Sequence, residues 1–248
     1  GAMLLPSQLL EALEGDAWCT ALQASPLVEH AGFSTADAAS RPLVLSERRL
    51  YLRRCWEYER RIDSALRQRL TTVEVTPADL PARLNNLFGS PKANAPIDWQ
   101  KLACALATRG AFSIVTGGPG TGKTTTVVRL LALLQAPAVE AGAPLLIRLA
   151  APTGKAAARL TESISLQVKS LEVDDTLRQK IPSDVTTVHR LLGSRPGTRH
   201  FRHHAGNRLP LDVLVVDEAS MIDLEMMANL LDALPDHARL VLLGDKDQ

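Results

Sequence analysis

Aromatic side chains and cysteines are scarce in this sequence. Phe, Trp and Tyr make up 4% of its 248 residues, so aliphatic side chains must supply most of any core. The three cysteines, Cys19, Cys55 and Cys104, are odd in number and far apart. This spacing fits neither a disulfide framework nor a metal cluster of the CxxC type. We therefore expect reduced thiols and a cytoplasmic location.

Strong net charge and long apolar runs are also missing. The formal net charge is +1, so any nucleic-acid surface has to be a local groove, because the molecule as a whole attracts phosphate weakly. The most apolar stretch, residues 127–151, is interrupted by Arg129, Glu140 and Arg148. A membrane-spanning helix needs about 18 or more apolar residues in a row. We therefore expect no membrane partner.

The N-terminal part of the chain predicts a small, mainly α-helical domain. Residues 42–45 and 50–52 are apolar runs on either side of a polar turn and predict a hairpin. Apolar residues then recur at helical spacing through 53–70, which predicts an amphipathic helix with an arginine-rich outer face. A further short helix is expected over 7–13. The opening Gly1-Ala2-Met3 is typical of a protease-cleavage scar.

A domain boundary is predicted near residue 92. Four prolines, together with Gly89 and Ser90, fall between residues 76 and 97, a composition typical of a linker. The predicted domains are therefore residues 1–92 and residues 93–248.

The second domain has the pattern of an α/β fold. Short apolar runs at 112–115, 145–150, 213–216 and 240–243 are predicted buried strands. The segments between them are long enough for crossover connections, which favours a mostly parallel sheet.

The segment GGPGTGKT fits the phosphate-binding loop pattern G-x-x-x-x-G-K-[ST] at every fixed position. A predicted strand precedes it and a predicted helix, residues 124–134, follows it. The glycines let backbone N–H groups converge on phosphate oxygens at a helix N-terminus. Lys123 is expected to reach the β- and γ-phosphates and the Thr124 hydroxyl to bind Mg²⁺. The predicted nucleotide-binding residues in this stretch are Gly117, Gly118, Pro119, Gly120, Thr121, Gly122, Lys123, Thr124 and Thr125.

Two adjacent carboxylates follow the predicted strand 213–216. This strand delivers Asp217 and Glu218 to the carboxyl edge of the sheet, beside the phosphate loop. Asp217 is the expected partner of Mg²⁺, and Glu218 is placed to polarise a water that attacks the γ-phosphate. The second carboxylate favours hydrolysis over simple binding, so Lys123, Asp217 and Glu218 are predicted catalytic residues.

Five segments stand in the order of the motifs of superfamily 1 DNA helicases. These segments are residues 117–126, 149–160, 187–193, 215–220 and 243–248. In their particular residues they resemble the RecD family, the alpha subunits of exodeoxyribonuclease V. The resemblance is clear from about residue 98 to residue 248 and fainter over 41–70. It implies that the second domain is a RecA-like P-loop NTPase domain, the first motor domain of a helicase that uses ATP.

The resemblance also implies roles for particular residues. Gln100 would contact the adenine base; the alternative is a residue that only lies on a helix surface. Gln248, with Asp245, would sense the γ-phosphate and counts as catalytic. The residues implied to line a path for single-stranded DNA are Pro152, Thr153, Gly154, Lys155, Thr187, His189 and Arg190. A hydroxyl, a backbone N–H and an ammonium group can bind phosphates there without reading sequence. A helix cap at Thr153 and solvated basic side chains are the alternative.

The activity that the resemblance implies belongs to a larger protein. Such a protein is a 5′→3′ DNA helicase subunit that works with RecB and RecC subunits at duplex ends, in double-strand break processing and recombinational repair. ATP hydrolysis drives its translocation on single-stranded DNA. The family's second motor domain supplies a catalytic arginine, a contribution of roughly 10³–10⁵ in rate. The sequence stops before such a domain, so we expect this piece to bind ATP and Mg²⁺ but not to unwind DNA.

Two other functions stay open at the level of sequence. The chain could be a P-loop ATPase or switch that does not act on DNA. It could also be a mainly structural subunit, whose first domain docks partner subunits.

Overall fold

The computed structural model describes residues 14–31, 41–71, 77–90, 96–118, 120–195, 197–198 and 200–245. The chain forms two compact units, Gly1–Arg61 and Ile62–Gln248, which we call the first and the second unit. Helix α3 (Arg53–Thr71) begins in one and ends in the other. Among the helices of the described ranges, none combines the length and apolar character that crossing a membrane requires.

The first unit contains a small three-stranded sheet. Its elements before α3 are α2 (Gly15–Gln23), β1 (Val28–His30), β2 (Leu43–Ser46) and β3 (Arg49–Leu52). Strand β2 lies in the centre, parallel to β1 and antiparallel to β3, so the predicted hairpin is confirmed. Arg53, the first residue of α3, forms an ion pair with Glu29 of β1 and donates to the carbonyl of Arg41. The helix expected over 7–13 lies outside the described residues.

Helix α3 confirms the amphipathic helix predicted over 53–70. In the second unit, its apolar residues Ile62, Ala65 and Leu66 pack against a buried cluster. Arg69 falls on the same face and is 2% exposed. Its guanidinium donates to the carbonyls of Leu234 and Pro235, at 3.3 and 3.0 Å from Nη2. This buried arginine therefore holds the end of α3 to the chain just after helix α10 (Leu224–Ala233).

The second unit is a parallel α/β domain, which confirms the predicted fold class. Its strands are β4 (Phe112–Thr116), β5 (Ile147–Ala151), β6 (Val185–Thr187), β7 (Val213–Val216) and β8 (Arg239–Gly244). Their order is β4-β8-β7-β5-β6, and all four pairings are parallel. Four of these strands lie within two residues of their predicted bounds. Sequence reasoning missed β6, because three residues are too few to show a strand pattern.

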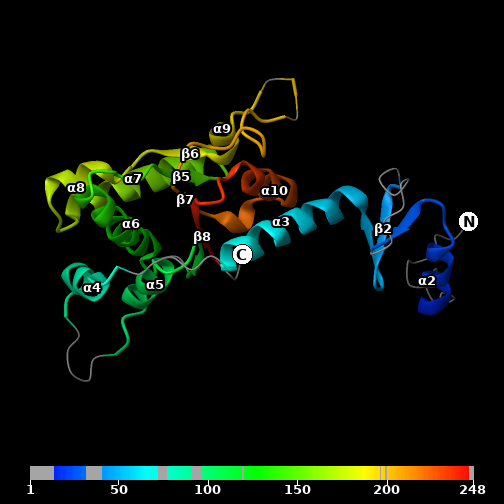
Figure 1. Cartoon of the computed structure of the whole chain (residues 1–248), viewed down its shortest axis with the longest axis horizontal. Coiled ribbons are helices and arrows are strands. Elements are labelled where there is room, and N and C mark those ends of the chain that lie inside the picture. The colour runs from blue at the N-terminus through cyan, green and yellow to red at the C-terminus, as the bar shows by residue number, and fades with distance from the viewer. Residues whose placement is uncertain are drawn as a thin grey trace, which may run out of the picture. The chain divides into compact units, whose positions relative to one another are not determined.

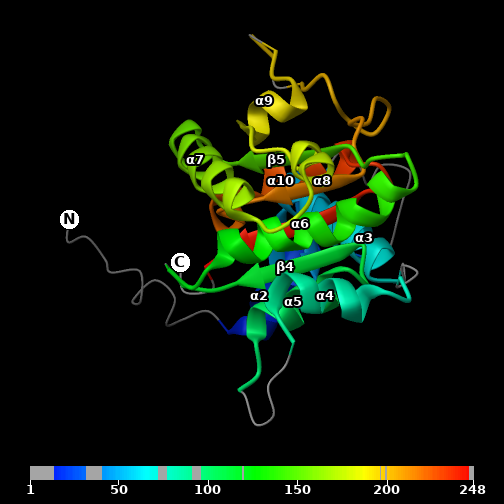
Figure 2. The same cartoon turned by 90° about the vertical axis from the view of Figure 1, so that its left-hand side faces the viewer.

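Helices cover both faces of this sheet. They are α4 (Leu80–Phe88), α5 (Trp99–Ala107), α6 (Lys123–Glu140), α7 (Gly154–Ser170), α8 (Asp175–Lys180), α9 (Val188–Leu192) and α10 (Leu224–Ala233). Residues alternate between the faces along β7, so Val213 and Val215 join the core under α6, whereas Leu214 and Val216 join the core under α10. Figure 1 shows α6 and α10 on opposite sides of the sheet. Figure 2 shows β4 at one edge, with α6 lying across the sheet.

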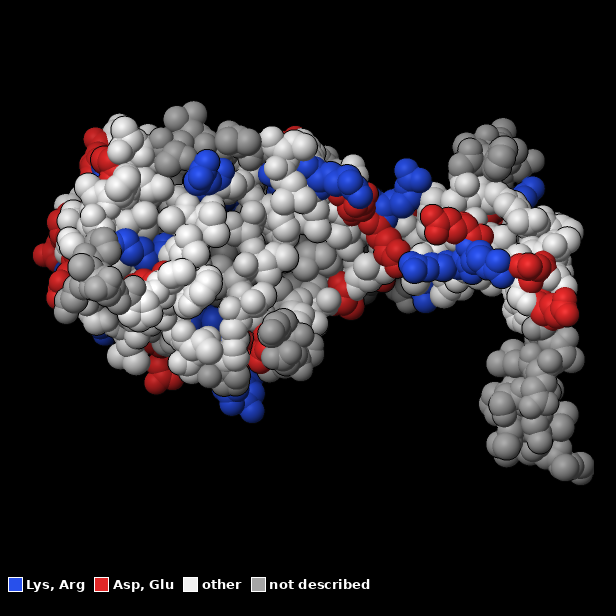
Figure 3. Space-filling view, turned by 90° about the horizontal axis from the view of Figure 1, so that it is seen from below, with Lys and Arg blue, Asp and Glu red and all other residues white. Residues whose placement is uncertain are grey.

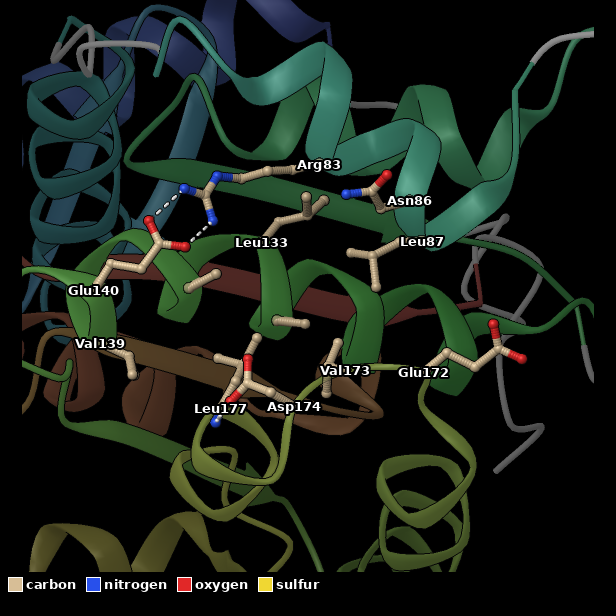
Figure 4. Close-up of a pocket in the computed structure, with 12 residues that line it drawn as sticks. Arg83, Asn86, Leu87, Leu133, Val139, Glu140, Glu172, Val173, Asp174 and Leu177 are labelled. Carbon is tan, nitrogen blue, oxygen red and sulfur yellow. Dashed lines mark hydrogen bonds and ion pairs between the residues drawn. The ribbon is translucent and has the colours of Figure 1, made fainter.

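Helix α4 is part of the second unit. Its Leu80 and Leu84 are buried in the same core as α6. Arg83 forms a bidentate pair with Glu140 at the end of α6, with nitrogen to oxygen distances of 2.7 and 2.6 Å. Figure 4 shows this pair beside a cavity of about 220 Å³ between α4, α6 and the start of α8. The domain boundary near residue 92 stays a prediction.

Candidate functional site

The phosphate loop runs from the end of β4 to the start of α6. Gly120 and Gly122 have φ angles of +76° and +82°, in the left-handed region that favours glycine. An added Cβ at Gly122 would lie 2.3 Å from Nε2 of Gln100, so the Gln100 side chain would have to shift. Gln100 itself, on the first turn of α5, donates from Nε2 to the carbonyl of Thr121 at 3.2 Å. The predicted adenine contact therefore lies against the loop, on a helix surface.

Lys123 is folded back onto the loop that precedes it. Its ammonium group donates to the carbonyl of Gly118 at 3.0 Å and also to the carbonyl of Gly117. Thr121 closes the same turn, since its hydroxyl donates to the Gly118 carbonyl at 2.9 Å. Thr124 is half-buried in the first turn of α6. Pro119 lies outside the described residues.

Asp217 and Glu218 follow directly after β7. Burial raises the pKa of Asp217, while a hydrogen bond from the Glu218 backbone and the charge of Lys123 oppose that rise. Lys123 is therefore close enough to influence this carboxyl. Glu218 has a φ of 48°, a left-handed conformation that is rare and strained for a residue with a side chain. Hydroxyl and carboxylate oxygens, as carried by Thr124 and Asp217, are the ligand type that Mg²⁺ prefers, so these residues fit that ion.

Strand register brings the predicted site residues to one edge of the sheet. On one side, Thr116 pairs with Gly244 and Val216 pairs with Leu242, so the phosphate loop, Asp245 and Asp217 follow strands that end together. On the other side, Ala151 pairs with Thr187. The two segments implied to bind DNA therefore follow neighbouring strands, β5 and β6, at the same edge as the phosphate loop.

The two threonines of the DNA segments serve as helix caps. The Thr153 hydroxyl accepts from the backbone N–H of Ala156 at 3.1 Å, and that of Thr187 accepts from the N–H of Arg190 at 3.2 Å. Each hydroxyl still has its own hydrogen to donate, so a cap does not exclude a phosphate contact. Three basic side chains in these segments are exposed, those of Lys155, His189 and Arg190. Pro152 is half-buried and Gly154 is exposed.

An aromatic contact joins α9, which follows β6 at this edge of the sheet, to the chain after it. The rings of His189 and Phe201 meet edge to face, with centroids 6.1 Å apart. Elsewhere on the second unit, the face seen in Figure 3 carries Lys and Arg as separate spots among the described residues, with no broad basic band. A net charge of +1 agrees with local rather than general attraction of phosphate.

Sequence reasoning missed one residue that contacts the predicted nucleotide set. The Thr125 hydroxyl donates to Oε1 of Gln167 at 3.1 Å, across 42 positions of sequence. No motif marks Gln167, which lies near the end of α7. Gln248, expected to sense the γ-phosphate, lies outside the described residues.

Comparisons with known proteins agree with this architecture. A family model described as an AAA domain matches residues 100–248, and a model described as the N-terminal domain of the RecBCD enzyme subunit RecD matches residues 2–51. The RecBCD enzyme subunit RecD of Mycolicibacterium smegmatis is 46% identical over 237 residues, which cover 94% of this chain and 39% of that protein. The chain belongs to the AAA domain family, in its RecD branch. Membership of this family implies nucleotide binding.

Other relatives in the RecD branch give the same result. RecD of Haemophilus influenzae is 44% identical, with 84% of this chain and 33% of that protein covered. The ATP-dependent RecD2 DNA helicase of Deinococcus radiodurans is 35% identical, with 85% of this chain and 26% of that protein covered. The chain thus spans about a quarter to two fifths of the length of these relatives.

Proposed function

We propose that this chain carries the ATP-binding site and part of the single-stranded DNA path of an ATP-dependent 5′→3′ DNA helicase subunit. The observation that carries the proposal is the shared sheet edge. The phosphate loop and Asp217 follow β4 and β7, and the segments at Thr153 and Thr187 follow β5 and β6. Ligands of open parallel sheets bind outside the carboxyl ends of the strands. Two ligands on one edge can influence each other.

In this proposal each residue at the phosphate loop has a defined task. Lys123 leaves the carbonyls of Gly117 and Gly118 and binds the β- and γ-phosphates. Thr124 and Asp217 hold Mg²⁺, which neutralises phosphate charge when bound. Glu218 accepts a hydrogen bond from the attacking water, and Gln100 holds the base against the loop. Asp245 and Gln248 respond to the γ-phosphate.

The DNA contacts in the proposal are contacts to the phosphates and to the flat faces of the bases. Lys155 and Arg190 supply positive charge at the ends of β5 and β6, and His189 with Phe201 offers aromatic surface for bases to stack on. None of these groups reads a base edge, so binding is independent of sequence and weakens as salt rises.

The proposal extends to the whole protein by family membership. Relatives named RecBCD enzyme subunit RecD suggest RecB and RecC as partners, and duplex ends as the place of action in double-strand break processing and recombinational repair. The predicted first domain, residues 1–92, which includes the whole region matched by the RecD N-terminal model, is the proposed docking part. Hydrolysis and unwinding need the rest of the protein, so this chain alone binds ATP and turns it over slowly.

Nucleotide binding is tested by changing Lys123. We expect Lys123→Ala to weaken binding of a fluorescent ATP analogue with Mg²⁺ by about tenfold or more, because charge-assisted hydrogen bonds to phosphate are lost. The matched control is Lys180→Ala, an exposed lysine of α8, which should bind like wild type. Equal binding by Lys123→Ala and wild type would contradict the proposal. A titration with oligo-dT separates a DNA translocase from a P-loop switch that does not act on DNA. In a translocase, Lys155→Ala should weaken binding of oligo-dT, whereas in a switch it should not change that binding.

A further inference from the structure

Thr125 directs its side chain away from its own helix. The next residue, Thr126, donates its hydroxyl to the carbonyl of Gly122 one turn back, at 3.0 Å. Thr125 instead points across to α7 and donates to Oε1 of Gln167 at 3.1 Å. Both side chains are half-buried, so water competes only partly for this bond. The first turn of the phosphate-loop helix is thereby attached to the last turn of α7.

Helix α7 joins this attachment to the predicted DNA segment. Thr153 caps the helix at one end, next to Lys155, and Gln167 lies near the other end. Seventeen residues of helix span roughly 25 Å. The helix is continuous and its buried face, which includes Leu160 and Ile164, packs closely on the core, so strain at one end can be transmitted to the other. A tilt imposed at Gln167 is therefore felt at Lys155.

The hydroxyl of Thr125 can serve only one acceptor at a time. A hydroxyl has a single hydrogen to donate, and Thr125 follows directly after Thr124 at the N-terminus of α6, where phosphate oxygens collect. A nucleotide that takes this hydrogen releases Gln167. There is room for the released amide, because Gln167 borders a recess of about 380 Å³ together with Arg129 and Ser170.

We propose that Gln167 is a positioning residue through which nucleotide binding at the phosphate loop changes the affinity of the Thr153–Lys155 segment for single-stranded DNA. In this proposal the hydrogen bond from Thr125 to Gln167 and a hydrogen bond from Thr125 to a nucleotide phosphate exclude each other, so α7 has two settings. This inference rests on the proposed function, since it requires both ligands to bind. By linkage, DNA must change the affinity for nucleotide by the same factor as nucleotide changes the affinity for DNA.

The test measures that factor directly. Dissociation constants of a fluorescent ATP analogue with Mg²⁺ are determined with and without saturating oligo-dT, and their ratio is the coupling factor. We expect Gln167→Leu, which cannot accept the hydrogen bond, to bring the ratio closer to one by about two- to tenfold. Gln167→Glu keeps an acceptor oxygen and should therefore retain coupling, unlike Gln167→Leu. Glu162→Gln, an exposed change on the same helix, is the control.

The outcomes separate this inference from the proposed function. If wild type binds neither ligand, the proposed function fails for this chain and the inference fails with it. If wild type binds both ligands but DNA leaves the affinity for nucleotide unchanged, the inference alone fails. If wild type shows coupling and Gln167→Leu keeps the same ratio, the inference alone is overturned. A double change, Thr125→Val with Gln167→Leu, should cost no more coupling than Gln167→Leu alone. Additive losses would show that the two side chains act separately.

Discussion

Two neighbouring residues directly after β7, Asp217 and Glu218, are in states that cost stability. Burial raises the pKa of Asp217, and Glu218 is in a left-handed backbone conformation. Such features cost stability and persist where the surrounding structure holds them, often at functional sites. At Asp217 the cost is electrostatic, because an ionised carboxylate is partly removed from water.

This cost predicts that Asp217→Asn stabilises the protein near neutral pH. The folded pKa lies above the ordinary value of 3.8, so the folded state holds the proton to higher pH than the unfolded state. Stability therefore falls as pH rises through the interval between these two pKa values, and it stays lowered at pH 7. We expect the thermal midpoint of the variant to be about 2 °C above wild type at pH 7, with the difference shrinking on acidification towards that ordinary value.

Exposed Asp184 offers the matched control, since Asp184→Asn should change the thermal midpoint little at either pH. Scanning calorimetry of the three proteins is sufficient. A midpoint for Asp217→Asn below that of wild type at pH 7 would show that burial of the carboxylate does not destabilise the fold.

Among the helices, α4 depends most visibly on charge. Arg83 donates to Glu140 of α6 and to Asp79 at the start of its own helix. These hydrogen bonds lower the pKa of both carboxyls. All three side chains reach solvent, so the pairs are screened by salt and each contributes modestly. The apolar contacts of Leu80 and Leu84 with the core supply the remaining stability of α4.

Acid should loosen α4 before it loosens the core. A carboxyl whose pKa is lower in the folded protein stabilises the fold at pH values above its unfolded pKa, which is 3.8 for Asp79 and 4.5 for Glu140. That contribution is lost as the pH falls through the folded pKa. Hydrogen exchange in α4, corrected for intrinsic rates, should speed up about two- to fivefold from pH 7 to pH 3. In Arg83→Met this increase in the exchange rate at low pH should be absent. In Arg159→Met, an exposed change on α7, the increase should remain. An equal increase in the exchange rate of α4 in both variants would show that the ion pairs of Arg83 do not cause it.

At the scale of the whole molecule, the division into units decides where the chain can be cut. Every described residue of the proposed nucleotide and DNA sites lies in the second unit, Ile62–Gln248. So do Arg69, which holds α3 to the end of α10, and α4 with its buried leucines. A cut at the predicted boundary near residue 92 would remove these contacts, whereas a cut before Ile62 would keep them.

Two shortened chains test this difference. Residues 62–248 should bind the ATP analogue within about twofold of the full chain. Residues 93–248 should melt about 5 to 15 °C lower than residues 62–248, because the cut exposes the core covered by Leu80 and Leu84. Equal thermal midpoints would place the domain boundary near residue 92, as the prolines and glycine of that region indicate.

Much of the site could be predicted from sequence, because its parts are local. The curl of GGPGTGKT, the carboxylates after an apolar run, the hairpin before α3 and each single strand or helix of the α/β pattern depend on residues close together in the chain. Such local patterns can be recognised without knowing which distant parts of the chain come into contact.

Only the tertiary structure decided which distant groups meet. Gln100 against Gly122, Thr125 against Gln167, and Arg69 against Leu234 are contacts across long separations. They depend on strand order and on how helices cross, and no periodicity of the sequence encodes either. The three-residue strand β6 is a further case, since it forms only because β5 offers it a partner. The sequence by itself determined which residues form the phosphate-binding loop. The packing of strands and helices decided which distant side chains contact that loop.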